Sequence, residues 1–350
     1  MRKKVISGKK IIIFGAGVEG CRALNYFGSE RVHCFADNNK SGQTCMNKAV
    51  ISFEELIEIN SEYDVIIAVG AATIDEIEHQ FDSESIGYYY LGDIVPYDDF
   101  DSKPEIKHFQ DKHKGERCFL IGNGPSLTAD DLTKLHENNE ITFGCNMIGK
   151  MFTQTAWRPD YYVIIDVATI NFQHQMIAEI EAKSKFIVAL DHLMEEEKVK
   201  VEKVLDNGIG DVFYYRSRIS LGRVGETISS DASKYVYTGV TVMNSMIQMA
   251  LYMGFEEIYL LGVDGGSLGN DNKNEYSHFY KDNDEAEFTE KVLTLYNSLA
   301  DEDVRKRVTA NLYENAENYA KVNGTKILNA TRGGVIENFK RVNFDDVFND

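Results

Sequence analysis

The stretch Ile11-Ile-Ile-Phe-Gly-Ala-Gly-Val-Glu-Gly20 joins a short apolar run to closely spaced glycines, and a segment with helical periodicity follows it. The stretch Cys118-Phe-Leu-Ile-Gly-Asn-Gly-Pro-Ser-Leu127 repeats this arrangement further along the chain. A buried strand that enters a helix through a glycine turn is typical of parallel α/β sheets. The two stretches therefore predict an α/β protein with two Rossmann-like parallel-sheet domains.

The length of the chain agrees with this division. A chain of 350 residues is long for one compact core, and chains of this size usually form two domains. We expect a Rossmann-like N-terminal domain over residues 1–95, a linker over 96–116 and a catalytic domain over 117–350. The linker is polar and holds two of the four prolines.

Apolar, β-branched runs locate the strands, and the periodic segments between them locate the helices. The first domain has expected strands at 11–14, 32–36, 65–69 and 88–91. The second has them from Cys118 and at 141–143, 161–165, 186–190, 212–215, 258–261 and 326–328. Ser52-Phe-Glu-Glu55 is a capping box that begins a helix. The clearest helix covers 241–253 and ends before Gly254, where a C-cap glycine belongs.

The composition excludes several classes of protein. A formal net charge of −19 argues against binding to nucleic acid or to an anionic membrane surface, because both need a basic patch. No apolar stretch approaches the ~18 residues of a membrane span, and the short apolar run after the basic start is too short for a signal peptide. Five cysteines without a Cys-x-x-Cys pair argue against a disulfide framework or a zinc site. We therefore expect reduced thiols and a cytoplasmic protein.

The first glycine motif has the spacing of a dinucleotide-binding turn, with candidate ligand contacts at Gly15, Gly17, Gly20 and Asp37. Asp37 ends the second expected strand, where it could hold a ribose hydroxyl. The segment also resembles the small N-terminal domains of sugar-modifying acyltransferases, which share the Phe-Gly-Ala-Gly start and an acidic turn after the second strand. We favour a structural or regulatory domain without a redox role over NAD binding.

The second glycine motif departs from the dinucleotide pattern because Asn123, Pro125 and Ser126 accompany Gly122 and Gly124. A proline is well suited to the first position of a helix, so we expect the helix to begin here. The N–H groups of the turn and the Ser126 hydroxyl would then face an anion at the helix N-terminus. The alternative is an ordinary strand-to-helix turn.

Several blocks of the second domain resemble one family in their order and spacing. They are Gly122-Asn-Gly-Pro-Ser-Leu127, Phe143-Gly-Cys-Asn146, Tyr162-Val-Ile-Ile-Asp166, Tyr237-Thr-Gly-Val240, the segment Gly254 to Asp264, Tyr276-Ser-His-Phe279 and the segment Gly324 to Gly334. The chain resembles the MptE-like and motility accessory factor (Maf) family, which is related in fold to bacterial sialyltransferases that use CMP-sialic acid. The resemblance covers about Arg117 to Val342.

The resemblance implies roles for individual residues. It implies nucleotide contacts at Gly122, Asn123, Gly124, Ser126, Asn146, Asp166, Thr238 and Gly239. Either His278 or Asp282 would be the base that takes the proton of the acceptor hydroxyl. Two departures from the sialyltransferases stand out: Gly265-Gly266-Ser267 replaces their tyrosines, and Asp282 replaces their general-base histidine.

Charged residues near the expected strand ends are further candidates. Asp166 and Asp264 each follow a strand, at the sheet edge where open α/β sheets bind ligands, and Asp264 is a candidate catalytic residue. Together they could hold Mg²⁺ if the reaction is phosphoryl transfer, since hard cations bind carboxylates. Arg216, Arg218 and Arg332 could hold a phosphate or carboxylate, and the alternative is charge balance at the surface.

Our first hypothesis is a glycosyltransferase that uses a CMP-activated acidic sugar in bacterial surface-glycan synthesis, with a nucleotide-sugar donor and a glycan acceptor as partners. It requires no metal or other cofactor. The second is a Mg²⁺-dependent diphosphokinase that resembles the 6-hydroxymethylpterin enzymes. The third is a non-catalytic partner that binds nucleotide-sugars. All three hypotheses are compatible with a homo-oligomer.

Overall fold

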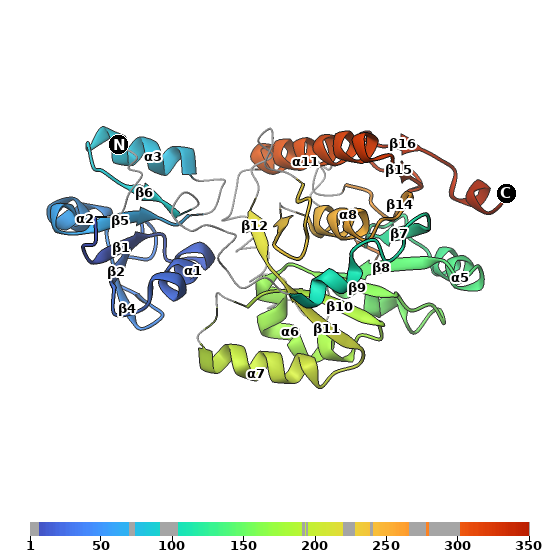
Figure 1. The fold of residues 1–350 in the computed structure, drawn as a ribbon, viewed down its shortest axis with the longest axis horizontal. Coiled ribbons are helices and arrows are strands. Elements are labelled where there is room, and N and C mark those ends of the chain that lie inside the picture. The colour runs from blue at the N-terminus through green and yellow to red at the C-terminus, as the bar shows by residue number, and fades with distance from the viewer. Residues whose placement is uncertain are drawn as a thin grey trace. The chain divides into compact units, whose positions relative to one another are not determined.

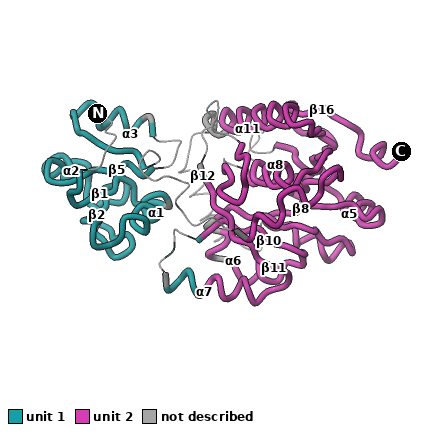
Figure 2. The backbone as a smooth tube through the Cα atoms, viewed as in Figure 1, with its two compact units in different colours: residues 1–102, 190–200 teal, residues 103–189, 201–350 magenta. Residues whose placement is uncertain are grey.

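The computed structural model describes residues 7–69, 74–91, 104–190, 193, 195–219, 228–238, 241–265, 278–279 and 302–349. The chain divides into two compact units (Figures 1 and 2). The first unit comprises residues 1–102 and 190–200, and the second comprises residues 103–189 and 201–350. Each unit contains a largely parallel sheet with helices, which confirms the predicted α/β class with two Rossmann-like sheets.

The first unit is built on a six-stranded sheet in the order β3-β4-β2-β1-β5-β6. Its pairs are parallel except for β3 and β4, which form an antiparallel hairpin. The strands are β1 Ile11–Phe14, β2 Val32–Ala36, β3 Thr44–Cys45, β4 Lys48–Ile51, β5 Asp64–Ile67 and β6 Tyr89–Tyr90. The described helices that connect these strands are α1 Val18–Phe27, α2 Phe53–Ile59, α3 Ile74–Ser83 and the short 3-10 helix η1 Asn60–Glu62.

Successive residues of β1 point to opposite faces of this sheet and enter two separate cores. Ile11 and Ile13 pack in one cluster with Leu24 of α1. The other two residues of β1 pack in a second cluster with Phe53 of α2 and Phe81 of α3. Because helices cover both faces, every residue of β1 is buried, and the strand is apolar throughout.

The second unit is built on an eight-stranded sheet in the order β11-β10-β9-β8-β7-β14-β15-β16, with parallel pairing throughout. Its strands are β7 Arg117–Ile121, β8 Ile141–Cys145, β9 Tyr161–Ile164, β10 Ser184–Val188, β11 Asp211–Tyr215, β14 Glu257–Leu261, β15 Lys326–Asn329 and β16 Lys340–Arg341. A separate parallel pair consists of β12 Ser217–Ile219 and β13 Val236–Thr238.

Helices of the second part of the chain alternate with these strands. They are α5 Ala129–Glu137, α6 Val167–Glu179, α7 Glu195–Asp206, α8 Val242–Tyr252, α11 Glu302–Asn323 and the 3-10 helices η2 Pro104–Phe109, η3 Asn146–Met151 and η4 Phe344–Phe348. Helix α8 contacts both β7 and α11 and is buried along almost its whole length (Figure 1). Its polar Gln248 is satisfied by the backbone of Tyr237, to which it is bonded through both its amide oxygen and its amide nitrogen.

The expected strands are present with shifts of a few residues at their ends. Helix α8 agrees with the expected 241–253: Thr241 caps it by accepting the N–H of Met243, and Gly254 follows with a φ of 82°. The capping box at Ser52 is also confirmed. The β3–β4 hairpin, the β12–β13 pair and β16 were not expected, because such short strands leave no clear alternation in the sequence.

Part of the segment expected to be a linker packs onto the second sheet. Ile106 and Phe109 of η2 are buried. The Phe109 ring lies 4.9 Å from that of Phe186 and 4.8 Å from that of Phe213, measured between centroids. Residues 92–103, which contain the first expected boundary, lie outside the described residues. Within the described part of the chain, we find no helix with the length and apolar character that a membrane crossing requires.

Candidate functional site

The order of the eight-stranded sheet places a topological switch point between β7 and β14. From β7 the chain adds β8, β9, β10 and β11 on one side, and it then returns to add β14, β15 and β16 on the other. In open parallel sheets, ligands bind at the carboxyl ends of the strands that flank such a point. The turn after β7 (122–128) and the turn after β14 (262–265) meet there, and we call this place the switch-point site.

The two turns are joined through their backbones. The N–H of Gly122 donates to the carbonyl of Leu261, and the N–H of Gly124 donates to the carbonyl of Gly262, both at 2.8 Å. A Cβ on Gly122 would overlap the Gly262 carbonyl, and a Cβ on Gly124 would overlap the Asp264 carboxylate. The glycines are therefore required by the close approach of the two turns, and their N–H groups are already engaged.

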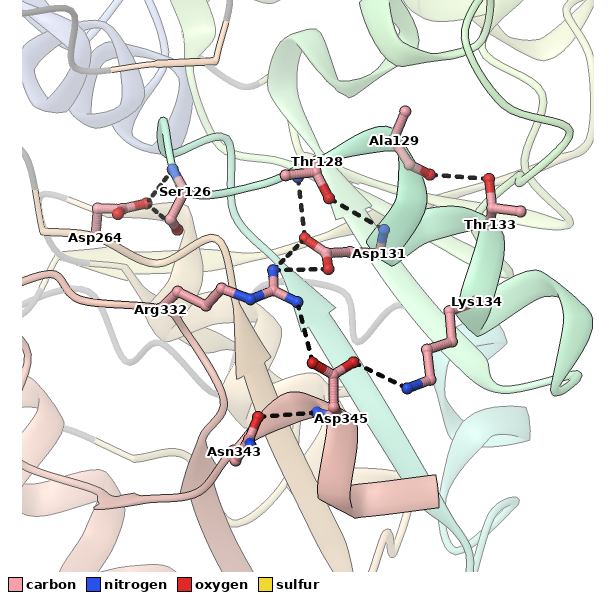
Figure 3. Close-up of polar contacts among 10 residues, drawn as sticks. All are labelled: Ser126, Thr128, Ala129, Asp131, Thr133, Lys134, Asp264, Arg332, Asn343 and Asp345. Atoms are coloured by element: carbon pink, nitrogen blue, oxygen red, sulfur yellow. Dashed lines mark hydrogen bonds and ion pairs between the residues drawn. The ribbon is translucent and has the colours of Figure 1, made fainter. Parts of the chain in front are cut away.

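Ser126 and Asp264 form the polar centre of the site (Figure 3). The Ser126 hydroxyl donates to Asp264 Oδ2 at 2.8 Å, and the Ser126 N–H approaches the same oxygen at 3.4 Å. The helix that was expected to begin at Pro125 begins at Ala129 instead, because Thr128 and Asp131 form a capping box there. The donors of Gly122, Gly124 and Ser126 thus serve neighbouring protein groups, and they do not form the expected anion nest.

Asn123 and Asn146 come together beside this centre. The Asn123 side chain is almost fully buried, and its Nδ2 donates to the carbonyl of Cys145 at the end of β8. Asn146 follows directly with a φ of 47°, and its carbonyl accepts the hydroxyl proton of Tyr162. The Oδ1 atoms of both asparagines are buried, and neither has a hydrogen-bond partner among the residues that the structure describes. A buried acceptor without a partner costs about 1–3 kcal/mol, so a ligand with N–H or O–H groups would be stabilised there.

His278 is placed against the same turn by its neighbour. The N–H of Phe279 donates to the carbonyl of Asn123 at 2.9 Å, and this bond brings the His278–Phe279 pair to the glycine turn. Asp282, the other candidate base, lies outside the described residues. The structure therefore brings together Asn123, Ser126, Asn146, Asp264 and the backbone next to His278.

Residues 97–270 match the family model described as 6-hydroxymethylpterin diphosphokinase MptE-like. The chain contains an MptE-like domain. No curated protein and no solved structure matches the chain. The family description names a diphosphokinase, which is a transferase, and the matched range includes Asn123, Ser126, Asn146 and Asp264.

The second candidate carboxylate of the MptE-like domain, Asp166, lies after β9, two strands away from β7. Its Oδ1 accepts the N–H of Thr169, which places it at the N-terminus of α6. Among the described residues there is no group of three or more histidine, cysteine, aspartate or glutamate side chains placed to hold a metal ion. Mg²⁺ would fit Asp264 or Asp166 only in combination with phosphate oxygens of a substrate, which is a common arrangement for this ion.

Arg332, one of the three candidate anion-binding arginines, is paired with carboxylates of the second unit (Figure 3). Its Nη1 lies 2.7 and 2.8 Å from the two carboxylate oxygens of Asp131, which is only 3% exposed. Asp345 lies 4.0 Å from the other terminal nitrogen. Arg332 therefore fastens the turn after β15 to the start of α5. The sequence motif Thr128-x-x-Asp131 is a capping pattern and could have identified Asp131 in advance.

The turn after β15 also contributes residues that sequence reasoning missed. Thr331 Oγ1 accepts the N–H of Val263 at 3.1 Å, and the N–H of Val335 donates to the carbonyl of Asp264 at 2.9 Å. The guanidinium of Arg341 donates to the carbonyls of Gly333 and Gly334 and holds the turn closed. The position of Asp264 thus depends on a segment more than sixty residues away in the chain.

The remaining candidates of the second unit lie near β12 and β13. Thr238 is buried at the end of β13, whereas Gly239 lies outside the described residues. Arg216 accepts the N–H of Val236 through its carbonyl at 2.8 Å. Arg218 belongs to β12, and its side chain lies outside what the structure describes. Roles of these residues in nucleotide or anion binding stay predictions.

In the first unit, the turn after β1 serves packing. Gly15 has a φ of 112°, and a Cβ on Gly20 would overlap the Gly15 carbonyl, whereas a Cβ on Gly17 would meet nothing within 4 Å. Asp37 accepts the N–H of Ala16 at 2.8 Å and also the N–H groups of the two residues that follow Asn38. Its carboxylate is therefore engaged by the backbone, and a ribose contact at Asp37 stays a prediction.

Proposed function

We propose that the second unit is a glycosyltransferase that transfers a sugar from a nucleotide-activated donor to a hydroxyl acceptor at the switch-point site. The observation that carries the proposal is the pair of buried amide oxygens, Asn123 Oδ1 and Asn146 Oδ1, which have no hydrogen-bond partner in the described part of the chain. With the Asp264 carboxylate they make the site rich in acceptors. Such a site suits a ligand with N–H and O–H groups, as in a nucleobase and a sugar, better than it suits a bare phosphate.

Cytosine is a base of suitable chemistry, because its exocyclic amine supplies two N–H donors. The two asparagines would accept from this amine. Sugar hydroxyls would donate to Asp264, whose other partner is the Ser126 hydroxyl. A CMP-activated sugar is therefore the donor that we propose first.

His278 is the residue that we propose as the general base. The bond between Phe279 and Asn123 keeps the histidine beside the turn after β7, and a histidine side chain is a common general base near neutral pH. It would take the proton of the acceptor hydroxyl as the new glycosidic bond forms and the bond to the nucleoside phosphate breaks. The proton stays on the imidazole, and the negative charge leaves with the nucleotide.

Phosphoryl transfer is the second candidate, because the matching family description names a diphosphokinase. In that case, Mg²⁺ bound to substrate phosphates and to Asp264 or Asp166 would neutralise the charge of the transferred group. The same asparagines would accept from the amine of a pterin or of an adenine. Dependence on Mg²⁺ separates the two candidates, since nothing in the first reaction needs a metal.

Thermal unfolding of the full-length protein with CMP, CDP and ATP, each in EDTA and in MgCl₂, tests the proposal. We expect CMP and CDP to raise the melting temperature in EDTA, and Asn123→Ala or Asn146→Ala to abolish the shift. Asn207→Ala is the matched control, because this exposed asparagine only bonds the carbonyl of Lys203. A shift with ATP and Mg²⁺ alone would replace the first candidate by the second, and no shift with any nucleotide would overturn both.

A turnover assay with CMP-sugars then tests the base. His278→Gln should lower kcat by about 10²- to 10⁴-fold, the usual contribution of a general base, while leaving the Kd for CMP unchanged. An equal loss of nucleotide affinity would assign His278 to binding instead. Unchanged kcat would exclude it as the base.

A further inference from the structure

Two cysteines of the first unit lie side by side at its glycine turn. The sulfur atoms of Cys21 and Cys45 are 3.5 Å apart, although the residues are separated by 24 positions. Cys21 follows Gly20 in the first turns of α1, and Cys45 ends β3. The Cys45 sulfur also lies 3.8 Å from the carbonyl of Ala16, within the glycine turn. Both residues are partly accessible to solvent.

The other three cysteines have different surroundings. Cys34, Cys118 and Cys145 are buried. Burial raises the pKa of Cys34 to about 11 and that of Cys145 to about 12, and it raises the pKa of Cys118 well above its usual range. A thiol must ionise to react, so these three cysteines are protected from oxidants because they are buried and because they retain their protons.

Cys45 has the opposite tendency. The hydrogen bond with Cys21 lowers the pKa of Cys45 to about 7, and the nearby charge of Lys40 acts in the same direction. The same bond raises the pKa of Cys21, which retains its proton. Lys40 is held close by because its Nζ donates to the carbonyl of Ala16 at 2.8 Å. A partly exposed thiolate next to a second thiol is the arrangement of redox-sensitive cysteine pairs.

We propose that Cys21 and Cys45 are an oxidisable dithiol that forms a reversible disulfide when the protein meets a peroxide. The Cys45 thiolate attacks hydrogen peroxide and becomes a sulfenic acid, with release of one water after proton transfer. The Cys21 sulfur then attacks this sulfur and expels a second water. Two thiols and one peroxide thus give one disulfide and two waters, and two electrons pass from sulfur to the peroxide.

The geometry favours a disulfide over a metal site. The sulfurs need to approach by roughly 1.5 Å to reach a bond length of about 2.05 Å. Among the described residues, the pair belongs to no group of three potential metal ligands. The disulfide would tie the β3–β4 hairpin to the start of α1 across the glycine turn. Oxidation would therefore reduce the mobility of this turn.

Peptide mapping of the full-length protein tests the proposal. The reduced protein is treated with increasing hydrogen peroxide, free thiols are alkylated after unfolding, and peptides are identified by mass spectrometry. We expect a peptide that links Cys21 to Cys45, with Cys34, Cys118 and Cys145 alkylated. Dithiothreitol should reverse the link. Oxidation of Cys45 to sulfinic acid without a link, or a link to any other cysteine, would overturn the proposal.

Thermal unfolding provides an independent measurement. A disulfide that closes a loop of this length should raise the melting temperature of the first unit by roughly 15 °C. The shift should be absent in Cys45→Ser and should remain in Cys34→Ser, the matched control. A peroxide-induced shift of equal size in Cys45→Ser would overturn the proposal.

Discussion

In the first unit the glycine turn after β1 leads almost at once into α1, which begins at Val18, whereas in the second unit β7 ends at Ile121 and α5 begins only at Ala129. In the first unit only Gly15 and Ala16 lie between the end of β1 and Gly17, the N-cap of α1, so Ala16 provides the only side chain of this turn. The longer turn of the second unit carries Asn123 and Ser126 to the edge of the sheet. Two similar sequence motifs thus produce one short turn that leads directly into its helix and one longer turn equipped with polar side chains.

Each turn is also closed by an aspartate, but from a different direction. Asp37 comes from the neighbouring strand β2 and binds backbone N–H groups of the first turn and of its own loop. Asp264 comes from β14, across the switch point, and binds a hydroxyl. The first carboxylate completes a turn within one edge of its sheet, and the second joins the turns after β7 and β14, at the edge where open parallel sheets generally bind ligands.

Alanine substitution at Gly20 has the largest expected effect, and its comparison with Gly17 would test whether the first glycine turn is required by packing. Gly20→Ala should destabilise the first unit by about 3 kcal/mol or more, because the new Cβ overlaps a backbone carbonyl that cannot move aside. Gly17→Ala, the matched control, should cost less than about 1 kcal/mol, since its Cβ meets open space. Hydrogen exchange in urea would report each unit separately. Equal effects of the two variants would contradict the packing role of the first turn.

The second difference concerns buried aspartates. Asp64 in the first unit is bonded by the N–H and the hydroxyl of Ser7, which are neutral, whereas Asp131 in the second is bonded by the charged Arg332. Arg332→Met should lower the free energy of unfolding by about 2 kcal/mol, because it leaves a buried carboxylate without its charge partner. Ser7→Ala should cost about 1 kcal/mol.

Chemical denaturation measures both effects, and the Asp131→Asn/Arg332→Met double variant should regain part of the loss. The Kd for nucleotide should be unchanged in Arg332→Met. A loss of nucleotide affinity without a loss of stability would mean that Arg332 serves the ligand and not the fold.

The next effect, smaller than those of Gly20→Ala and Arg332→Met, is expected from pH. Lys185 of the second unit is fully buried, and its Nζ donates to the carbonyls of Ile177 and Ala178 at the end of α6, whereas no lysine is buried among the described residues of the first unit. Burial lowers the pKa of Lys185 to about 8. Above that pH the folded protein has released a proton that the unfolded chain still binds, so stability should rise.

Between pH 8 and 9.5 the gain should be about 1.5 kcal/mol. Urea denaturation over this range measures it, and Lys185→Met should remove the pH dependence. A fall of stability over the same range in the parent protein would show that other groups dominate.

Much of this comparison could be predicted from the sequence. The apolar runs predict β1, β7 and most other strands, because strands buried on both faces need apolar residues at every position. The position of Asn146 next to Asn123 also follows, since neighbouring parallel strands end at the same edge. The pairing of Arg332 with Asp131 could not be predicted, because 201 positions separate the two residues and only the tertiary fold brings them together.

The start of α5 shows a different limit. Pro125 is a good first residue for a helix, but Thr128 and Asp131 provide a complete capping box, and two satisfied N–H groups outweigh a favourable φ. The Cys21–Cys45 contact was missed for a third reason. The β3–β4 hairpin that carries Cys45 is too short to be detected from its pattern of apolar residues.

The last strand, β16, has a consequence for the behaviour of the protein at high concentration. It consists only of Lys340 and Arg341, and the Arg341 side chain is turned back onto the carbonyls of the turn after β15. A long apolar edge strand offers its free backbone groups to another chain and so promotes aggregation. This end of the eight-stranded sheet offers two basic residues instead, so a second copy would find neither the length nor the apolar surface for continued strand pairing.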